Sequence, residues 1–139
     1  MKRTANAHWN GNLKEGKGSL STQSTTLNKT QYSFNTRFAE GVGTNPEELL
    51  SASHAGCFTM ALSATLEQAG FIANDLDTKA TVELNMQTLS ITSITLDLVA
   101  APIQGLSAEQ FQGYAKAAKE NCILSKALAA VPITLNVTY

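Results

Sequence analysis

Residues Gly43 to Gly70 read GTNPEELLSASHAGCFTMALSATLEQAG, the longest segment of the chain that is typical of one unbroken helix. Asn45 is a favoured N-cap, Pro46 suits the first helical position, and Glu48 follows Asn45 by three residues, as a capping box requires. Gly70 supplies the left-handed residue that commonly follows a helix. Between these caps the helix is apolar nearly all round, which predicts a buried central helix with Cys57 in its middle.

The composition is that of an ordinary globular domain. The chain has 139 residues, 43% of them hydrophobic, so it is long enough to bury a core within one domain, residues 1–139. A formal net charge of −1 gives no electrostatic reason to expect binding to nucleic acid or to an anionic membrane. No apolar run approaches the roughly 20 residues of a membrane span. The first residues, MKRTANAHWNG, lack the apolar region of a secretory signal, so we expect a cytoplasmic protein.

The segments around this helix predict an α+β fold in the order βββ-α-ββ-αα-β. Antiparallel sheets would wrap around the long central helix, with a hairpin turn at Asn10-Gly11. Alternation of apolar and polar residues, turn residues and caps place the elements. The predicted strands are Thr4–Trp9, Ser19–Thr26, Tyr32–Phe38, Thr78–Met86, Ile94–Leu98 and Ile133–Tyr139, and the two later helices are Ser107–Glu120 and Cys122–Ala130.

The two cysteines are too few for a disulfide framework or for a cysteine zinc site. Free cysteine is among the most buried residue types, so Cys57 is readily explained as an inert core residue. Cys122 stands in the first turn of a predicted helix, where unpaired amides and the helix dipole favour a thiolate. From the residues alone, Cys122 would be the more acidic thiol of a redox couple and Cys57 its resolving partner, if the fold brings them together.

Arg37 and Glu47 are candidates to act on the thiol, although each also has a simple structural explanation. Arg37 could be a solvated charge at the end of a strand, and Glu47 a first-turn acid that complements the helix dipole. Ten residues at 1.5 Å each place Glu47 about 15 Å along the helix axis from Cys57. A bridging Arg37 side chain, a bend in the helix, or a second chain could close that gap. We favour a second chain, because the small residues around Cys57 suit a close helix-on-helix dimer seam.

The histidines do not predict a metal site. His54 lies one turn before Cys57 and could be a base or a hydrogen-bond partner, but a lone histidine among alanines is more often a satisfied core or interface residue. His8 lies in the predicted N-terminal hairpin, and no third ligand is in view.

Several motifs together resemble those of the OsmC/Ohr family. These are GTNPEELL followed by HAGCF, the N-terminal AHWNGNLKEGKG, the YSFNTRF segment, and a second cysteine followed by Ser125. The balance of motifs is closer to the OsmC (osmotically inducible protein C) branch, and the likeness runs from about Thr4 to Val137. The resemblance implies a cytoplasmic thiol peroxidase with no metal or prosthetic group, which forms an intertwined homodimer and reduces organic hydroperoxides.

Matching positions imply roles for four residues. Cys57 resembles the peroxidatic cysteine and Cys122 the resolving one, which reverses the order suggested by the helix dipole. Arg37 matches the arginine that lowers the thiol pKa, and Glu47 matches the glutamate that orients it. The family then implies a sulfenic acid at Cys57, a Cys57–Cys122 disulfide, and reduction by an external dithiol, often a lipoylated protein.

One departure from the family pattern concerns Ile123, which stands where many members place proline after the second cysteine. Proline there would fix the start of the last helix, so the reach of Cys122 is open to question. A non-enzymatic dimeric stress protein that binds an apolar ligand at the subunit interface is the alternative function. A redox sensor is a third possibility, although no segment suggests an output element.

Overall fold

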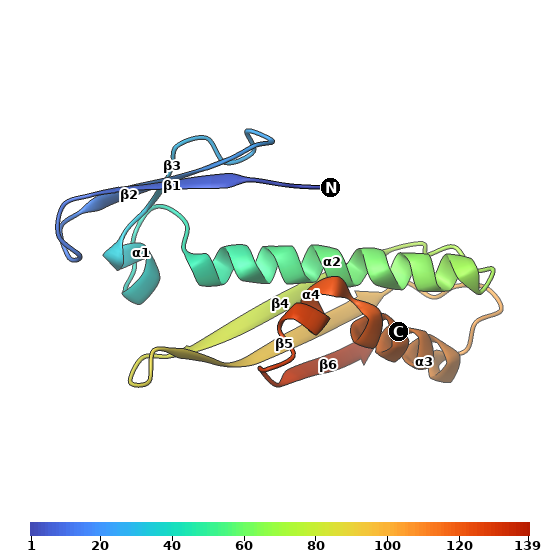
Figure 1. Cartoon of the computed structure of the whole chain (residues 1–139). Helices are drawn as coiled ribbons and strands as arrows, with labels where there is room; N and C mark the ends of the chain where they lie inside the picture. Colours follow the sequence, from blue (N-terminus) through green and yellow to red (C-terminus); the bar gives the residue numbers. More distant parts are fainter. The chain divides into compact units, whose positions relative to one another are not determined.

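A computed structural model describes all 139 residues of the chain and shows an α+β fold, as the sequence predicts. The backbone forms two compact units, Met1–Leu49 and Leu50–Tyr139, each built on a three-stranded sheet (Figure 1). A single domain over residues 1–139 stays a prediction. The elements are β1 (Ala5–Asn10), β2 (Lys17–Thr22), β3 (Thr30–Tyr32), α1 (Phe34–Phe38), α2 (Pro46–Gln68), β4 (Leu76–Asn85), β5 (Ser90–Ala100), α3 (Ala108–Asn121), α4 (Ile123–Ala127) and β6 (Ile133–Thr138).

The N-terminal sheet is an antiparallel meander in the order β1-β2-β3. Asn10 pairs with Lys17, so the connection is a six-residue loop and the predicted two-residue turn at Asn10-Gly11 is wrong. The loop closes on itself, because Asn12 accepts hydrogen bonds from the amides of Glu15 and Gly16 through its side chain and backbone carbonyl. These local bonds favour the longer loop over a tight turn.

The predicted strand Tyr32–Phe38 is wrong beyond its first residue, because Phe34–Phe38 forms the one-turn helix α1. Ser33 caps this helix: its hydroxyl accepts from the amide of Thr36, and the Thr36 hydroxyl accepts from the amide of Ser33. This reciprocal pair is a capping box in which threonine replaces the usual glutamate or glutamine. Arg37 therefore lies in the last turn of a helix and not at the end of a strand.

Helix α2 begins and ends where the sequence predicts. The Asn45 side chain accepts a 2.8 Å hydrogen bond from the amide of Glu48, and Gly70 adopts the left-handed conformation with a φ of 84°. The amide of Phe71 then donates to the carbonyl of Leu66, which closes the helix end.

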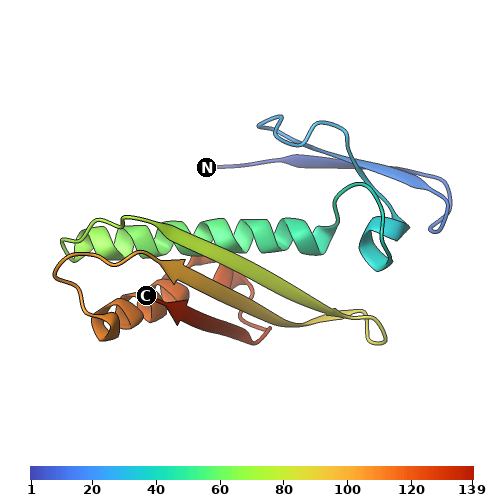
Figure 2. The same ribbon diagram turned by 180° about the vertical axis from the view of Figure 1, so that it is seen from behind.

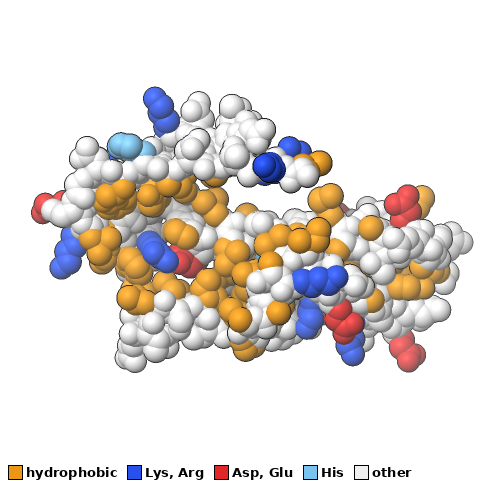
Figure 3. All heavy atoms as spheres, in the orientation of Figure 1, with side chains coloured by type: hydrophobic (Ala, Val, Ile, Leu, Met, Phe, Trp, Pro, Cys, Tyr) orange, Lys and Arg blue, Asp and Glu red, His pale blue; other side chains and the backbone are white.

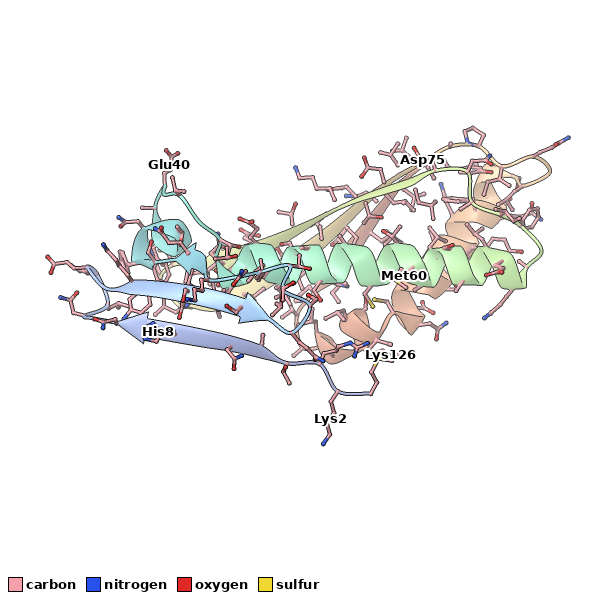
Figure 4. All side chains as sticks on the ribbon, turned by 90° about the horizontal axis from the view of Figure 1, so that it is seen from above. Lys2, His8, Glu40, Met60, Asp75 and Lys126 are labelled. Atoms are coloured by element: carbon pink, nitrogen blue, oxygen red, sulfur yellow. The ribbon has the colours of Figure 1, made fainter.

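The prediction that α2 is buried all round is wrong for the chain by itself. Only one stripe is buried, and its members recur every four residues: His54, Phe58, Leu62 and Leu66. The opposite face is exposed, and Met60, midway along the helix, is 75% exposed (Figure 4). By length and composition alone α2 would also pass as a membrane-spanning helix, although no membrane span is expected from the sequence. A core helix of a globular protein passes the same test, and the buried stripe is typical of a core helix.

The C-terminal sheet has the order β4-β5-β6, and α2 and α3 cover one of its faces (Figure 2). Strand β4 pairs with β5 antiparallel, whereas β6 pairs with β5 in parallel, so the prediction of purely antiparallel sheets is wrong here. The two helices α3 and α4 form the crossover that a parallel pair needs. Alternate residues of β5 are buried against the helices: Ile94, Leu96, Leu98 and Ala100.

Candidate active site

The two cysteines lie next to each other in the C-terminal unit. Their sulfur atoms are 3.1 Å apart, although 65 positions separate them in the sequence. Cys57 stands on the flank of the buried stripe of α2 and is partly exposed, whereas Cys122 is 1% exposed and belongs to the hydrophobic core. Both thiols are free. The geometry therefore provides one accessible sulfur in contact with one buried sulfur.

Cys122 is placed by the junction of two helices. It is at once the C-cap of α3, where its amide donates to the carbonyl of Ala118, and the N-cap of α4. Asn121 is the last residue of α3, and α4 begins at Ile123, one residue after the predicted helix start at Cys122. Ile123 begins α4 without the proline that the resemblance leads us to expect.

The surroundings shift the pKa values of the two thiols in opposite directions. Burial raises the pKa of the Cys57 thiol and the contact with Cys122 raises it further, against the opposing effect of the Leu124 and Ile123 amides. Burial also raises the pKa of Cys122, but the amide and hydroxyl of Ser125, the Cys57 thiol and the Leu124 amide outweigh it and lower that pKa. Within this unit the buried thiol is therefore the more acidic one, as the helix-dipole argument predicts.

A buried polar pair lies beside the thiols. His54 Nε2 and Ser125 Oγ are 2.8 Å apart, and both side chains are buried. His54 precedes Cys57 by one helical turn, and Ser125 follows Cys122 by one turn, so the same two helices position both pairs. Burial lowers the pKa of His54, which keeps its imidazole neutral at pH 7.

Arg37 and Glu47 form an ion pair in the N-terminal unit. Arg37 Nη2 lies 2.8 Å from Glu47 Oε1, and Arg37 Nε donates to both oxygens of the same carboxylate. The Arg37 side chain is 42% exposed and the Glu47 side chain 14% exposed. The Arg37 guanidinium also lies over the ring of Phe38, 5.2 Å from its centroid. Glu47 and the aromatic ring thus fix the orientation of Arg37, as expected from the resemblance.

An apolar hollow of about 270 Å³ opens beside this guanidinium. Figure 3 shows hydrophobic side chains gathered on the N-terminal unit between its sheet and α1. The wall formed by Trp9 and Tyr32, with ring centroids 5.4 Å apart, stands over Gly18. The lining residues are Trp9, Leu13, Tyr32, Ser33, Phe34, Arg37, Phe38 and Pro46. One cationic group therefore borders a space that is otherwise suited to a hydrocarbon group.

The model of the family described as OsmC-like protein matches residues 39–136 of the chain. The chain belongs to the OsmC-like family. It is 47% identical over 132 residues to the protein named peroxiredoxin OsmC from Escherichia coli (strain K12), covering 94% of this chain and 91% of that protein. This identity extends the likeness to nearly the whole chain, beyond the residues that the family model matches.

Solved structures of OsmC-like and Ohr proteins share this fold. An organic hydroperoxide resistance protein OsmC from Legionella pneumophila aligns with a TM-score of 0.73 at 24% identity, over 98% of this chain and 97% of that one. The organic hydroperoxide resistance protein OhrB of Bacillus subtilis aligns with a TM-score of 0.68 at 24% identity, over 97% and 98% of the two chains. At these identities the likeness concerns the fold.

The residues expected from the OsmC resemblance come together as two pairs. Cys57 and Cys122 form one pair in the C-terminal unit, and Arg37 and Glu47 form the other in the N-terminal unit. No group of three or more histidine, cysteine or acidic residues is arranged to hold a metal ion. The sequence did not predict the contact of Ser125 with His54, although the spacing of three residues between Cys122 and Ser125 at a helix start was a usable signal.

Proposed function

We propose that this chain is a thiol peroxidase that reduces organic hydroperoxides to alcohols. The observation that carries the proposal is the contact of two free thiols at 3.1 Å, one partly exposed and one buried. Its family membership and its 47% identity to a protein named peroxiredoxin OsmC support the same activity. Cys57 is the thiol that reacts with peroxide in this proposal, because it is the accessible one of the two.

The reaction begins at the Cys57 sulfur. Its thiolate attacks one oxygen of the hydroperoxide, the O–O bond breaks, and the departing alkoxide takes a proton to leave as an alcohol. The hydroperoxide is reduced, and Cys57 is oxidised to a sulfenic acid. The Cys122 thiolate then attacks the Cys57 sulfur, the S–O bond breaks, and the released hydroxide takes a proton to become water. An external dithiol reduces the resulting disulfide and is itself oxidised, which restores both thiols.

Arg37 supplies the positive charge in this proposal. Cys57 by itself has a raised pKa, so a nearby cation is needed to keep it anionic near pH 7. The Arg37 guanidinium, held by Glu47, would lower that pKa and stabilise the charge developing on the departing alkoxide. The apolar hollow beside Arg37 would hold the hydrocarbon part of the peroxide, which favours organic hydroperoxides over hydrogen peroxide.

We also propose that the protein works as a homodimer in the cytoplasm. The exposed face of α2 carries Gly56 and the apolar side chain of Met60. A Cβ added to Gly56 would meet no atom within 4 Å, so the space around this glycine is open. A second chain could approach this face closely and bring its own Arg37 to Cys57. Sedimentation that finds only folded monomers at micromolar concentration would remove the shared site.

The reductant that restores the two thiols in this proposal is a dithiol, and a lipoylated protein is the candidate for it.

Thiol counting and turnover test the proposed activity. One equivalent of cumene hydroperoxide should consume both thiols of the reduced protein, and t-butyl hydroperoxide should be turned over with dihydrolipoamide as reductant. Cys57→Ser should abolish turnover and leave one free thiol after peroxide addition. Ser53→Ala, which changes an exposed residue on the same helix, is the matched control.

The alternative is a dimeric protein that binds an apolar ligand and uses its cysteines only for packing. That alternative gains support if the peroxide leaves both thiols unreacted. If Cys57→Ser retains full peroxidase activity, the assignment of Cys57 as the reacting thiol is wrong.

A further inference from the structure

His54 is a fully buried polar side chain with only one of its two ring nitrogens satisfied. Nε2 lies 2.8 Å from the Ser125 hydroxyl oxygen, and Nδ1 is buried without a partner. Nothing in the proposed reaction so far uses this histidine. A buried imidazole with an unsatisfied nitrogen costs free energy, which indicates that its one hydrogen bond serves a purpose.

The unsatisfied Nδ1 decides where the imidazole proton lies. The ring is neutral, because burial lowers its pKa, so it carries one N–H. If that proton were on Nδ1, a buried N–H donor would have no acceptor. In folded proteins such a donor is rarer than a buried acceptor atom that receives no hydrogen bond. The proton therefore lies on Nε2, and His54 donates to the Ser125 oxygen.

This tautomer leaves the Ser125 hydroxyl with its own proton available to a further acceptor. Ser125 follows Cys122 by three residues at the start of α4, and its hydroxyl acts on the Cys122 sulfur in the direction expected of a donor, by lowering the pKa of that thiol. A hydroxyl that already accepts from His54 is polarised and becomes a stronger donor. His54 Nε2 and Ser125 Oγ are thus in contact, and Ser125 stands one helical turn after Cys122, the N-cap of α4, from where its hydroxyl can turn toward the Cys122 sulfur.

We propose that His54 and Ser125 are positioning residues for the disulfide-forming step, in which a hydrogen-bond relay from α2 to α4 orients the Ser125 hydroxyl toward the Cys122 sulfur. This inference rests on the proposed peroxidase function and deepens it. The relay stabilises the anion of Cys122 that attacks the Cys57 sulfenic acid. In that attack the S–S bond forms, the S–O bond breaks, and the proton first lost from Cys122 ends on the released hydroxide as water.

The charges on the surrounding elements do not replace this relay. Of the ionisable groups that face the Cys122 sulfur, Cys57 comes from α2 and acts on its pKa directly. On α3 and α4, the amine of Lys119 donates to the carbonyl of Ile133, while Glu120 and Lys126 are exposed. None of these three charges is among the causes of the Cys122 shift, so Ser125 is the side chain outside the thiol pair that acts on it.

The test is a titration of Cys122 in a Cys57→Ser background, followed by thiolate absorbance at 240 nm and corrected with a variant that lacks both cysteines. This readout does not require a reagent to reach the buried sulfur. Ser125→Ala should raise the titration midpoint by about one pH unit, since a hydrogen bond to a charged group stabilises it by roughly that much. Ser125→Thr, which keeps the hydroxyl, should titrate like the unchanged background.

A double-substitution cycle separates a relay from two independent contacts. His54→Gln, or His54→Leu if the glutamine variant is unfolded by circular dichroism, should raise the midpoint when Ser125 is present. The same substitution should have no further effect once Ser125→Ala is in place, because the relay acts only through that hydroxyl. A midpoint that Ser125→Ala leaves unmoved would overturn the proposal, as would a His54 effect that adds in full to that of Ser125→Ala.

A single-turnover experiment on the chain with both cysteines links the relay to the reaction. After one equivalent of cumene hydroperoxide, Ser125→Ala should form the disulfide up to about tenfold more slowly below both midpoints, and the deficit should disappear above them. A deficit that persists at high pH would indicate a merely structural role and count against the relay. If the unchanged chain consumes no peroxide at all, the proposed function fails, while the 240 nm titration still tests the relay by itself.

Discussion

The two units of this chain hold their functional groups by different means. In the C-terminal unit the buried residues are large and apolar, including Phe58 and Phe111, and Cys122 is one of them. In the N-terminal unit the buried side chains are those of Thr36 and Thr44, which contribute little apolar surface. One unit therefore fixes its thiols within a packed core, whereas the other holds its arginine at the surface by an ion pair and by the face of one aromatic ring.

This difference suggests a division of labour between stability and reactivity. Burial of apolar surface is the main favourable term in folding, so the C-terminal unit can sustain a desolvated thiol pair. An exposed ion pair contributes little to stability, so the Arg37–Glu47 pair adds little to folding and leaves room for the role proposed for it in the reaction.

The largest expected effect contrasts two phenylalanines. Phe58→Ala should lower the free energy of unfolding by about 3–5 kcal/mol, because it empties a fully buried site in the core. Phe38→Ala removes a half-buried ring and should cost about 1 kcal/mol. Urea denaturation followed by far-ultraviolet circular dichroism measures both, and Trp9, the chain's one tryptophan, reports on the N-terminal unit separately. Equal losses for the two variants would contradict the contrast between the units.

A second prediction concerns the charge supplied by the N-terminal unit. Arg37→Ala should slow the reaction with hydroperoxide by a factor on the order of ten or more at pH 7, since an adjacent cation favours a thiolate by about one to three pKa units. Its stability should change little, because the ion pair is partly exposed. The measurement is the rate of peroxide loss under single-turnover conditions.

Arg3→Ala is the matched control, because it removes the chain's other arginine from an exposed position. Glu47→Gln should fall between the two, since it leaves the charge but loosens its orientation. Equal rates for Arg37→Ala and Arg3→Ala would show that Arg37 has no special role.

The smallest effect expected is a dependence of stability on pH in the C-terminal unit. Burial lowers the pKa of His54 in the folded state below its ordinary value of 6.5, so the unfolded chain takes up the proton first as the pH falls. The stabilisation is complete above pH 6.5 and is lost as the pH drops from there toward the folded pKa, by at most about 1.4 kcal/mol per pH unit. Urea midpoints measured between pH 7.5 and 5.5 should show the loss.

His54→Gln should lack this component of the pH dependence, whereas His8→Gln, which replaces an exposed histidine, should keep it. A pH dependence that is the same in both variants would mean that His54 is not its source.

The parts of the fold that local chemistry determines were predictable. The ends of α2 follow from Asn45 and Gly70, and the start of α3 follows from Ser107, which forms a capping box with Gln110. Helix α1 was missed because Phe34 and Phe38 share the alternation of a strand, while its capping box uses threonine at the third position. The parallel pairing of β6 was missed because alternation within a strand carries no information about its direction.

The candidate site also has features that could be predicted from the sequence and features that could not. The pairing of Arg37 with Glu47 and the contact of the two thiols were expected from the resemblance, because local patterns do not show that residues 65 positions apart meet. The roles of the two thiols stay a prediction. The prediction of a helix buried all round failed because α2 has only one buried stripe within its own chain. Ser125 was noted only as part of the family motif and was given no role, because a serine in the first turn of a short helix is usually explained by solvent exposure or capping.

Gly18 constrains the apolar hollow although it contributes no side chain to it. A Cβ at this position would overlap the ring of Tyr32 and lie 2.7 Å from the Trp9 ring, closer than non-bonded carbon atoms approach. The rings of Trp9 and Tyr32 can pack together over β2 only because Gly18 has no Cβ to occupy that space. The shape of the hollow thus depends partly on a residue that does not line it, and substituting only the lining side chains would not reveal this dependence.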